Sequence, residues 1–267
     1  MPIIPSIECR PLSQEAFGKL AFQVMQNLFA IHDEYGRFYN ELIYKRELTR
    51  RMAGVEVEVG VDVVHQDFVK TYFADVIASN SGLFELKTVE AIHARHRAQT
   101  THYLLLFGLH HGKIVNMRPE SVEHEFVNVR ASLGELRNPK ITYLSNTSDA
   151  TGSKRLQDIL LGLVHDWGTG LDIALYEEAI THFLGGESKV ITRVPVTGTG
   201  GELAEQKMRL VNHNAVFKLT AFPPDKSSTS KFCTHAQRLL THTPLDFIHW
   251  INIHQTEVTF KTIEKNK

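Results

Sequence analysis

The chain has 267 residues, 42% of them hydrophobic, which is enough to form a packed core in one large or two smaller domains. Its 29 Lys and Arg nearly balance its 30 Asp and Glu, which excludes a globally basic surface and leaves only local patches for nucleic-acid contacts. The two cysteines, Cys9 and Cys233, are too few for a disulfide framework. The apolar runs are shorter than the roughly 20 residues that span a bilayer, and no signal peptide is evident. We therefore expect a cytoplasmic protein with no membrane partner.

The first half of the chain alternates between helical and strand patterns. Apolar residues at helical spacing predict a helix over 15–34, and Ser13 is placed to cap its start. The further elements expected, in order, are a helix from about 39 to 52, strands at 55–64, 72–78 and 83–89, a helix at 91–107, and strands at 113–117 and 126–129. This order predicts an α/β fold with a mixed sheet flanked by helices.

The expected hairpin at 72–89 carries an unusual set of charges. Asp75 lies in its first strand, and Glu85 and Lys87 lie on one face of its second strand. Charges in half-buried strands are costly to remove from water, and a divalent metal with a polarised water would offset that cost. The simpler alternative is a polar strand edge on which Glu85 pairs with Lys87 or with a neighbour.

Two helical pairs add polar groups to this set. Glu41 and Tyr44 lie on one face of the second helix, and Gln99 and Tyr103 lie on one face of the third. Each pair alone is unremarkable, because a helical glutamate is usually solvated. In sequence order the candidate set becomes Glu41, Asp75, Glu85, Lys87 and Gln99.

With these residues in view, the segment 20–118 resembles the GxxExxY proteins, a branch of the PD-(D/E)XK nuclease superfamily. The resemblance rests on Gly36 followed by Glu41-Leu42-Ile43-Tyr44, on Ala74-Asp75-Val76-Ile77, on Phe84-Glu85-Leu86-Lys87, on Ala98-Gln99 followed by Tyr103, and on Gly112–Asn116. One position departs from the family pattern, because Phe38 stands where the name-giving glycine belongs, three residues before Glu41.

The resemblance implies a restriction-endonuclease-like core and a metal-dependent nuclease that hydrolyses phosphodiester bonds. It implies that Asp75 and Glu85 hold Mg²⁺ or Mn²⁺, with Glu41 completing the acidic pocket. Lys87 would orient or activate the attacking water, Gln99 would position water or phosphate, and Tyr103 would assist. The implied partner is nucleic acid, with DNA favoured over RNA.

The second half of the chain repeats parts of this pattern. Gly36, Tyr44 and Gly54 align with Gly168, Tyr176 and Gly186 at one constant separation, and similar strand and helix segments follow up to about residue 260. We therefore expect a core duplicated in tandem, with a nuclease-like domain at 1–135, a connector at 136–155 that includes Asn146-Thr147-Ser148-Asp149, and a degenerate, pseudo-nuclease domain at 156–267. The alternative is chance similarity between two α/β segments.

The second copy lacks the candidate carboxylates. Ile173, Arg209, Lys218 and Thr220 stand at the places of Glu41, Asp75, Glu85 and Lys87. This set cannot bind Mg²⁺, so we expect a lobe that packs as a pseudo-dimer partner within the chain, in which Arg209 and Lys218 contact a phosphate. A homo-oligomer is compatible with this interpretation.

A basic stretch opens the third helix of the first half. Arg95, His96 and Arg97 predict either a solvated face or a face that contacts phosphate beside the site. His93 and His96 are three residues apart and could ligate zinc, although no cysteine lies near them in the sequence. Two other functions remain open: a catalytically silent nucleic-acid-binding or scaffold protein, and a protein–protein adaptor.

Overall fold

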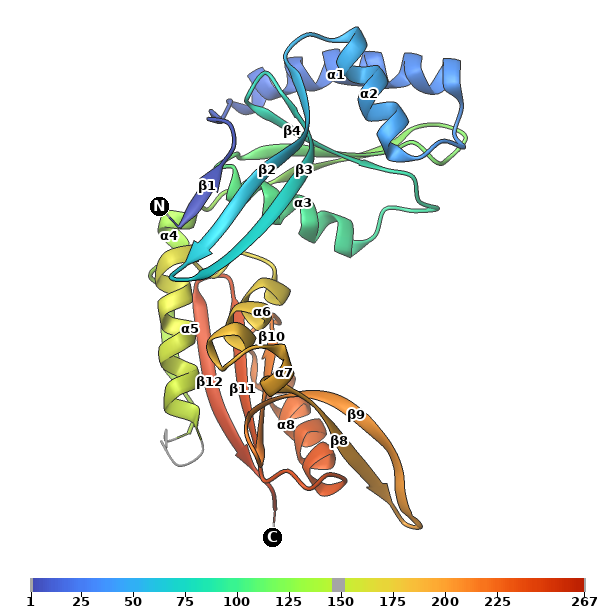
Figure 1. The fold of residues 1–267 in the computed structure, drawn as a ribbon. Coiled ribbons are helices and arrows are strands. Elements are labelled where there is room, and N and C mark those ends of the chain that lie inside the picture. Colours follow the sequence, from blue (N-terminus) through green and yellow to red (C-terminus); the bar gives the residue numbers. More distant parts are fainter. Residues whose placement is uncertain (1, 146–151, 267) are drawn as a thin grey trace. The chain divides into compact units, whose positions relative to one another are not determined.

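A computed structural model of the chain describes residues 2–145 and 152–266 (Figure 1). It divides into two compact units, Met1–Leu133 and Gly134–Lys267. Each unit contains one mixed, six-stranded sheet and its own helices. The protein is thus a mixed α/β protein whose two sheets are flanked by helices, as in the restriction-endonuclease-like fold.

The first unit has three main helices and one sheet. Its elements are β1 (Ile3–Pro5), α1 (Gln14–Tyr35), α2 (Glu41–Arg51), β2 (Val55–His65), β3 (Phe68–Ala78), β4 (Gly82–Lys87), α3 (Ala94–Leu106), β5 (His111–Asn116) and β6 (Glu123–Asn128). The strands lie in the order β1-β2-β3-β4-β5-β6, and only β4 and β5 are parallel. Helices α1 and α2 cover one face of this sheet, and α3 lies on the other (Figure 1).

Local sequence explains where the first helices begin and end. The Ser13 hydroxyl accepts a hydrogen bond from the Ala16 N–H at 3.2 Å and so caps α1, as predicted. Gly36 ends the helix with a positive φ of 73°, which favours glycine. The apolar stripe of α1 and the Tyr44 ring pack on the inward side chains of β3 and β4, including Val76 and Phe84. This core holds the hairpin firmly beneath the helices.

The second unit repeats the order of the first. Its elements are β7 (Lys140–Tyr143), α5 (Ser153–Trp167), α6 (Ile173–Phe183), α7 (Glu187–Val190), β8 (Ile191–Gly198), β9 (Gly201–Asn212), β10 (Ala215–Thr220), α8 (Lys226–Thr241), β11 (Phe247–His254) and β12 (Glu257–Glu264), preceded by the short α4 (Leu133–Leu136) at the unit boundary. The strand order is β7-β12-β11-β10-β9-β8, with β10 parallel to β11 and β7 parallel to β12.

Five strands therefore have the same order and directions in both units, while the sixth differs. In the first unit the extra strand, β1, pairs with β2, whereas in the second the extra strand, β7, pairs with β12. Both extra strands are short edge strands that the sequence pattern did not predict. Strand β7 lies in the segment 136–155 that we expected to be a connector, so this part of that expectation is corrected. Its Asn146-Thr147-Ser148-Asp149 motif lies outside the described residues.

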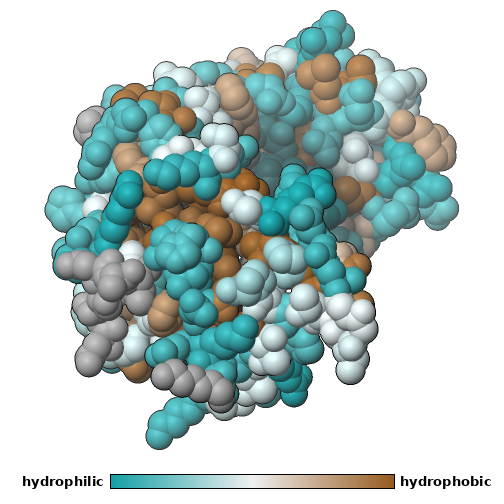
Figure 2. Space-filling model, turned by 60° about the horizontal axis from the view of Figure 1, so that its bottom comes forward, coloured by the Kyte–Doolittle hydropathy of each residue, from teal (hydrophilic) through white to brown (hydrophobic). Residues whose placement is uncertain are grey.

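The surface is mixed in character. The face drawn in Figure 2 is largely hydrophilic, with hydrophobic residues gathered in recessed patches. Across residues 2–145 and 152–266, no helix is both long enough and apolar enough to cross a bilayer.

Candidate active site

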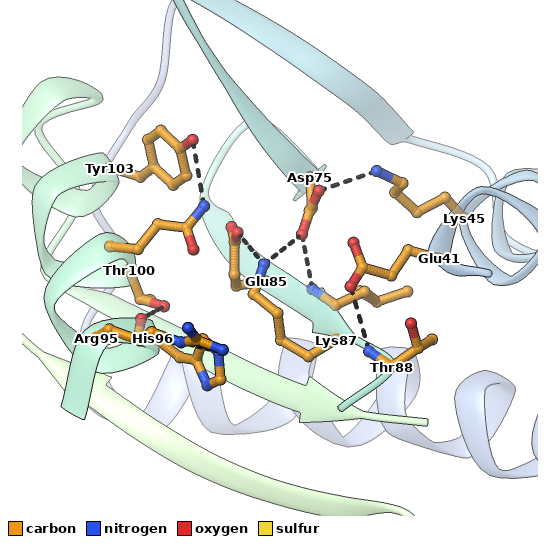
Figure 3. A network of polar contacts seen from close by, with 12 residues as sticks. Glu41, Lys45, Asp75, Glu85, Lys87, Thr88, Arg95, His96, Thr100 and Tyr103 are labelled. Atoms are coloured by element: carbon orange, nitrogen blue, oxygen red, sulfur yellow. Dashed lines mark hydrogen bonds and ion pairs between the residues drawn. The ribbon is translucent and has the colours of Figure 1, made fainter. Parts of the chain in front are cut away.

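The predicted hairpin forms, and it brings the three central residues together (Figure 3). The Lys87 ammonium lies 2.7 Å from Oε1 of Glu85 and 3.5 Å from Oδ2 of Asp75. The second contact is aided by Leu86, whose backbone N–H donates to Oδ2 of Asp75 at 3.0 Å. All three charged side chains are buried, so their charges interact with little screening.

Lys45 is a site residue that the sequence analysis missed. It lies on α2, one turn after Glu41, and its Nζ is 2.9 Å from Oδ1 of Asp75. It also forms an ion pair with Glu58. A lysine four residues after Glu41 lies on the same helix face, and that spacing was the available clue.

Glu58 reaches Lys45 from an irregular point in β2. In the pairing of β2 with β3, Val57 faces Val76 and Val59 faces Ala74, so Glu58 lies at the position opposite Asp75. Its φ is 51°, an uncommon value for a residue other than glycine. This position opposite Asp75 places the Glu58 carboxylate beside Lys45 and the charged cluster.

Glu41 lies at the first position of α2, facing the end of β4. Its Oε1 accepts a hydrogen bond from the Thr88 N–H at 3.2 Å (Figure 3). Burial raises the pKa of Glu41, and the positive charge of Lys87 partly offsets that rise. Glu41 thus borders the cluster, as predicted, and also fixes the chain that leaves Lys87.

Burial shifts the pKa values of Glu85 and Lys87 in opposite directions, because it disfavours the charged form of each group. Burial, with the nearby Asp75 charge, raises the pKa of Glu85 to about 8. Burial alone would lower the pKa of Lys87, but the charges of Glu85 and Asp75 outweigh it and hold that pKa above its usual value. Lys87 is therefore a cation near neutral pH, suited to stabilising negative charge and not to accepting a proton.

The cluster offers an incomplete but compatible site for a divalent cation. Oε2 of Glu85 is buried with no hydrogen-bond partner, which is unusual for a carboxylate oxygen. Four carboxylates, Glu41, Glu58, Asp75 and Glu85, surround two ammonium groups, so the fully ionised cluster carries an excess of negative charge. Nevertheless, no three His, Cys, Asp or Glu side chains among the described residues are grouped closely enough to hold a metal ion. Lys45 contacts Oδ1 of Asp75, and Lys87 contacts Oδ2 of Asp75 and Oε1 of Glu85, so both lysines would compete with a metal ion for these oxygens.

Gln99 and Tyr103 both lie on α3. Tyr103 lies across the site from α2 (Figure 3). The Gln99 amide nitrogen is 3.5 Å from the Tyr103 hydroxyl. Burial raises the pKa of Tyr103, so its phenol stays protonated and can donate a hydrogen bond.

The basic stretch of α3 has mostly internal partners. Both His96 ring nitrogens are engaged, Nδ1 by the His93 N–H at 3.0 Å and Nε2 by the Arg95 side chain at 3.2 Å. Burial lowers the pKa of His96, which favours the neutral ring. Arg97 forms a two-pronged pair with Glu125 at 2.6 and 2.8 Å. Because the His96 nitrogens are occupied, a zinc site on His93 and His96 would require the ring to give up these bonds.

The second unit carries an ion pair between α6 and β9. Arg209 of β9 lies 3.2 Å from Glu177 of α6. Glu177 follows Lys45 at the separation that relates Gly168 to Gly36. Glu177 thus neutralises much of the positive charge expected of Arg209, while Lys218 remains half-buried on β10.

We expected Arg209 at the place of Asp75, but the strand register corrects this expectation. Leu210 pairs with Val216 as Ile77 pairs with Leu83, so Arg209 corresponds to Val76 and the buried Met208 corresponds to Asp75.

Elsewhere in the second unit, aromatic packing replaces the charged cluster. Lys218 pairs in register with Trp250, as Glu85 pairs with Ile114. The Trp250 indole donates to the Thr220 hydroxyl at 2.8 Å, and its ring stacks on Phe232 with centroids 4.7 Å apart. These bulky rings fill the face of the sheet that α8 covers.

One hydrogen-bond pattern, in which an asparagine side chain bonds both the N–H and the carbonyl of one other residue, is present in both units and is called the asparagine bracket below. The Asn116 side chain accepts from the Val89 N–H at 3.1 Å and donates to the Val89 carbonyl at 2.8 Å. Asn252 makes the same two bonds with Phe222, at 3.1 and 2.9 Å. Likewise, the hydroxyls of Tyr44 and Tyr176 donate to the carbonyls of Gly36 and Gly168.

Comparison with known proteins identifies the first unit. Residues 18–129 match the family model of the PD-(D/E)XK nuclease superfamily, so this unit carries a domain of that superfamily. No curated protein matches the chain. Among solved structures, the crystal structure of SSO0001 is 20% identical, with a TM-score of 0.29, over 45% of this chain and 61% of that one. The chain thus spans about three fifths of that structure.

Proposed function

We propose that the first unit is a Mg²⁺- or Mn²⁺-dependent nuclease that hydrolyses phosphodiester bonds of nucleic acid. The superfamily to which the unit belongs is one of nucleases. The observation that carries the proposal is the buried, unpartnered Oε2 of Glu85 beside Asp75, because a carboxylate oxygen buried in this way calls for a cation.

The proposed roles follow from position and charge. Asp75 and Glu85 would hold the ion, with Glu41 at the border of the pocket. Such an ion polarises a phosphoryl oxygen and lowers the pKa of a bound water. The Lys87 ammonium would stabilise charge that develops on the phosphate. The Gln99 amide and the Tyr103 phenol would orient the phosphate or the water from the α3 side.

The second unit is proposed to be a degenerate copy without catalytic groups. Its support is the shared five-strand order and the repeated asparagine bracket. Lys218 and the guanidinium of Arg209 would then contact substrate phosphate, with Glu177 reducing the contribution of Arg209. We expect this unit to act as the partner that other nucleases obtain by dimerising.

One observation favours a second candidate function, a silent nucleic-acid-binding protein. Lys45 and Lys87 already pair with Asp75 and Glu85, so the cluster is stable as an internal ion-pair network. A network of this kind could remain after metal chemistry had been lost.

A cleavage assay separates the two functions. Linear, circular and single-stranded DNA and RNA would be incubated with Mg²⁺ or Mn²⁺ and wild type, Glu85→Gln or Lys87→Ala. We expect metal-dependent products that fall by orders of magnitude in both variants, while binding measured in EDTA persists. The matched control is Glu257→Gln, a strand glutamate of the second unit that pairs with Lys140. A folded wild type that makes no products with either metal would refute the nuclease and favour the silent binding protein.

A further inference from the structure

The loop between α1 and α2 exposes two aromatic rings. Phe38 is 76% exposed and Tyr39 is 49% exposed. A phenylalanine exposed to this extent gains little from packing, because most of its apolar surface remains in water. The loop leads directly into Glu41, so these rings stand at the edge of the candidate active site.

Two guanidinium groups flank the Phe38 ring. The Arg37 Cζ is 5.2 Å and the Arg118 Cζ is 5.6 Å from the ring centroid. Both distances are within the range of cation–π attraction. Arg37 has no acidic partner among the described residues. Arg118 has only a 3.7 Å contact with Glu90, whose side chain is 92% exposed, so this pair is weak.

The aromatic loop is held in place at its base. The Tyr44 hydroxyl donates to the Gly36 carbonyl at 2.7 Å, which fixes the start of the loop. His32 bonds the carbonyl of Pro119 at 3.1 Å and so ties the segment carrying Arg118 to α1. The residue before Arg118, Met117, donates its N–H to the Lys87 carbonyl at 2.7 Å. The ring and its two cations are therefore anchored close to the chain that carries Lys87.

The second unit lacks this arrangement. At the constant separation that relates the two units, Thr169 and Gly170 stand at the places of Arg37 and Phe38. The residue two after Asn252 is His254, at the place of Arg118. The exposed ring and its guanidinium pair thus occur only in the unit that has the carboxylates.

We propose that Phe38 is a stacking platform for an unpaired base of the substrate strand, with Arg37 and Arg118 contacting the adjacent phosphates. An aromatic face flanked by cations binds single-stranded nucleic acid in this manner, because every base has a π face and every phosphate is anionic. In a regular duplex the base faces are already stacked and cannot reach the ring. The inference rests on the proposed nuclease function and specifies its substrate as a strand that is unpaired next to the cut.

The test measures binding apart from cleavage. Glu85→Gln protein in EDTA would be titrated into fluorescent oligonucleotides, namely single-stranded DNA, single-stranded RNA, blunt duplex DNA and duplex DNA with a single-stranded overhang. We expect Phe38→Ala, added to Glu85→Gln, to weaken binding to single strands and overhangs by about 10-fold or more and to leave duplex binding unchanged. The two single strands show whether DNA or RNA is preferred.

Two further variants keep this test specific. Phe38→Trp should preserve binding, and its fluorescence should be quenched when a base stacks on it. Phe22→Ala is the matched control, because Phe22 is 64% exposed on α1 and should not affect any substrate. An equal loss of affinity for duplex and single strand in Phe38→Ala, or no loss of affinity, would overturn the proposal that Phe38 is a stacking platform.

The outcomes for the platform and for the nuclease are distinguishable. If Phe38-dependent binding to single strands occurs but wild type cuts nothing with either metal, the nuclease fails while the platform stands. If wild type cuts and Phe38→Ala cuts single strands with unchanged kcat and KM, the platform fails while the nuclease stands.

Discussion

The ammonium of Lys45 lies 2.9 Å from Oδ1 of Asp75, in a pair whose side chains are only 6% and 12% exposed. Two buried charges are costly to remove from water, and their mutual attraction repays that cost only when the pair is intact. Lys45 also pairs with Glu58, so one lysine joins β2 to the candidate metal ligand on β3. The pair therefore holds Asp75 in position while no cation is bound.

Lys45→Met is expected to destabilise the metal-free protein by about 3 kcal/mol, because it leaves the buried Asp75 charge without one partner. The measurement is the urea midpoint of the first unit, followed by a probe within that unit. We expect added Mn²⁺ to restore more stability to this variant than to wild type, since the ion supplies the missing positive charge.

Lys19→Met is the matched control for this change. Lys19 pairs with Glu15 at 2.8 Å, but both side chains are more than three quarters exposed, so its loss should cost under about 1 kcal/mol. Equal effects of the two substitutions would show that the Lys45 pair is no more important than a surface pair.

The raised pKa of Glu85 predicts how stability depends on pH. With an ordinary value near 4.5 in the unfolded chain and about 8 in the folded one, the folded protein retains a proton that the unfolded chain has released. Stability should therefore fall as pH rises from about 4.5 through 8 and then level off. Glu85→Gln removes this contribution. At pH 8.5 the metal-free variant should therefore be more stable than wild type by on the order of 1–3 kcal/mol in the free energy of unfolding.

The comparison is made by chemical unfolding of both proteins from pH 5 to pH 8.5 in EDTA. The difference in the free energy of unfolding between the two proteins should grow with pH. The contributions of the other titrating groups are the same in both proteins and therefore cancel. A difference that stays constant or shrinks across this range would rule out a raised pKa at Glu85.

Metal binding can be detected without any substrate. If Glu85 and Asp75 hold a divalent ion, Mn²⁺ at 100 times its dissociation constant should stabilise the protein by about 2.7 kcal/mol. Thermal unfolding with and without Mn²⁺ measures this effect. We expect the shift in wild type and in Glu15→Gln, a variant at an exposed surface carboxylate, but not in Glu85→Gln. A shift that persists in Glu85→Gln would place the ion elsewhere.

The sequence predicted the elements whose patterns are strong, and it missed features set by tertiary contacts. The periodicity of α1, its Ser13 cap and the hairpin carrying Asp75 and Glu85 all depend on local residues, and each is confirmed. Strands β1 and β7 are short edge strands whose few residues show no clear period. Lys45 was missed because a helical lysine is normally solvated, and only packing of α2 on the sheet buries it. For the same reason the sequence could not show that both nitrogens of His96 have partners.

The asparagine brackets allow the two units to be compared directly. Asn116→Ala and Asn252→Ala each remove the two bracket hydrogen bonds, together with further bonds of the same buried side chain, so each should destabilise its own unit by about 2 kcal/mol or more. Only the Asn116 bracket holds the segment between Lys87 and Val89, where the Thr88 N–H meets Glu41. Asn116→Ala should therefore lower kcat about 10-fold or more at a temperature where both units remain folded, whereas Asn252→Ala should leave kcat unchanged. Equal loss of kcat in both variants would mean that the second unit takes part in cleavage and is not merely a degenerate partner.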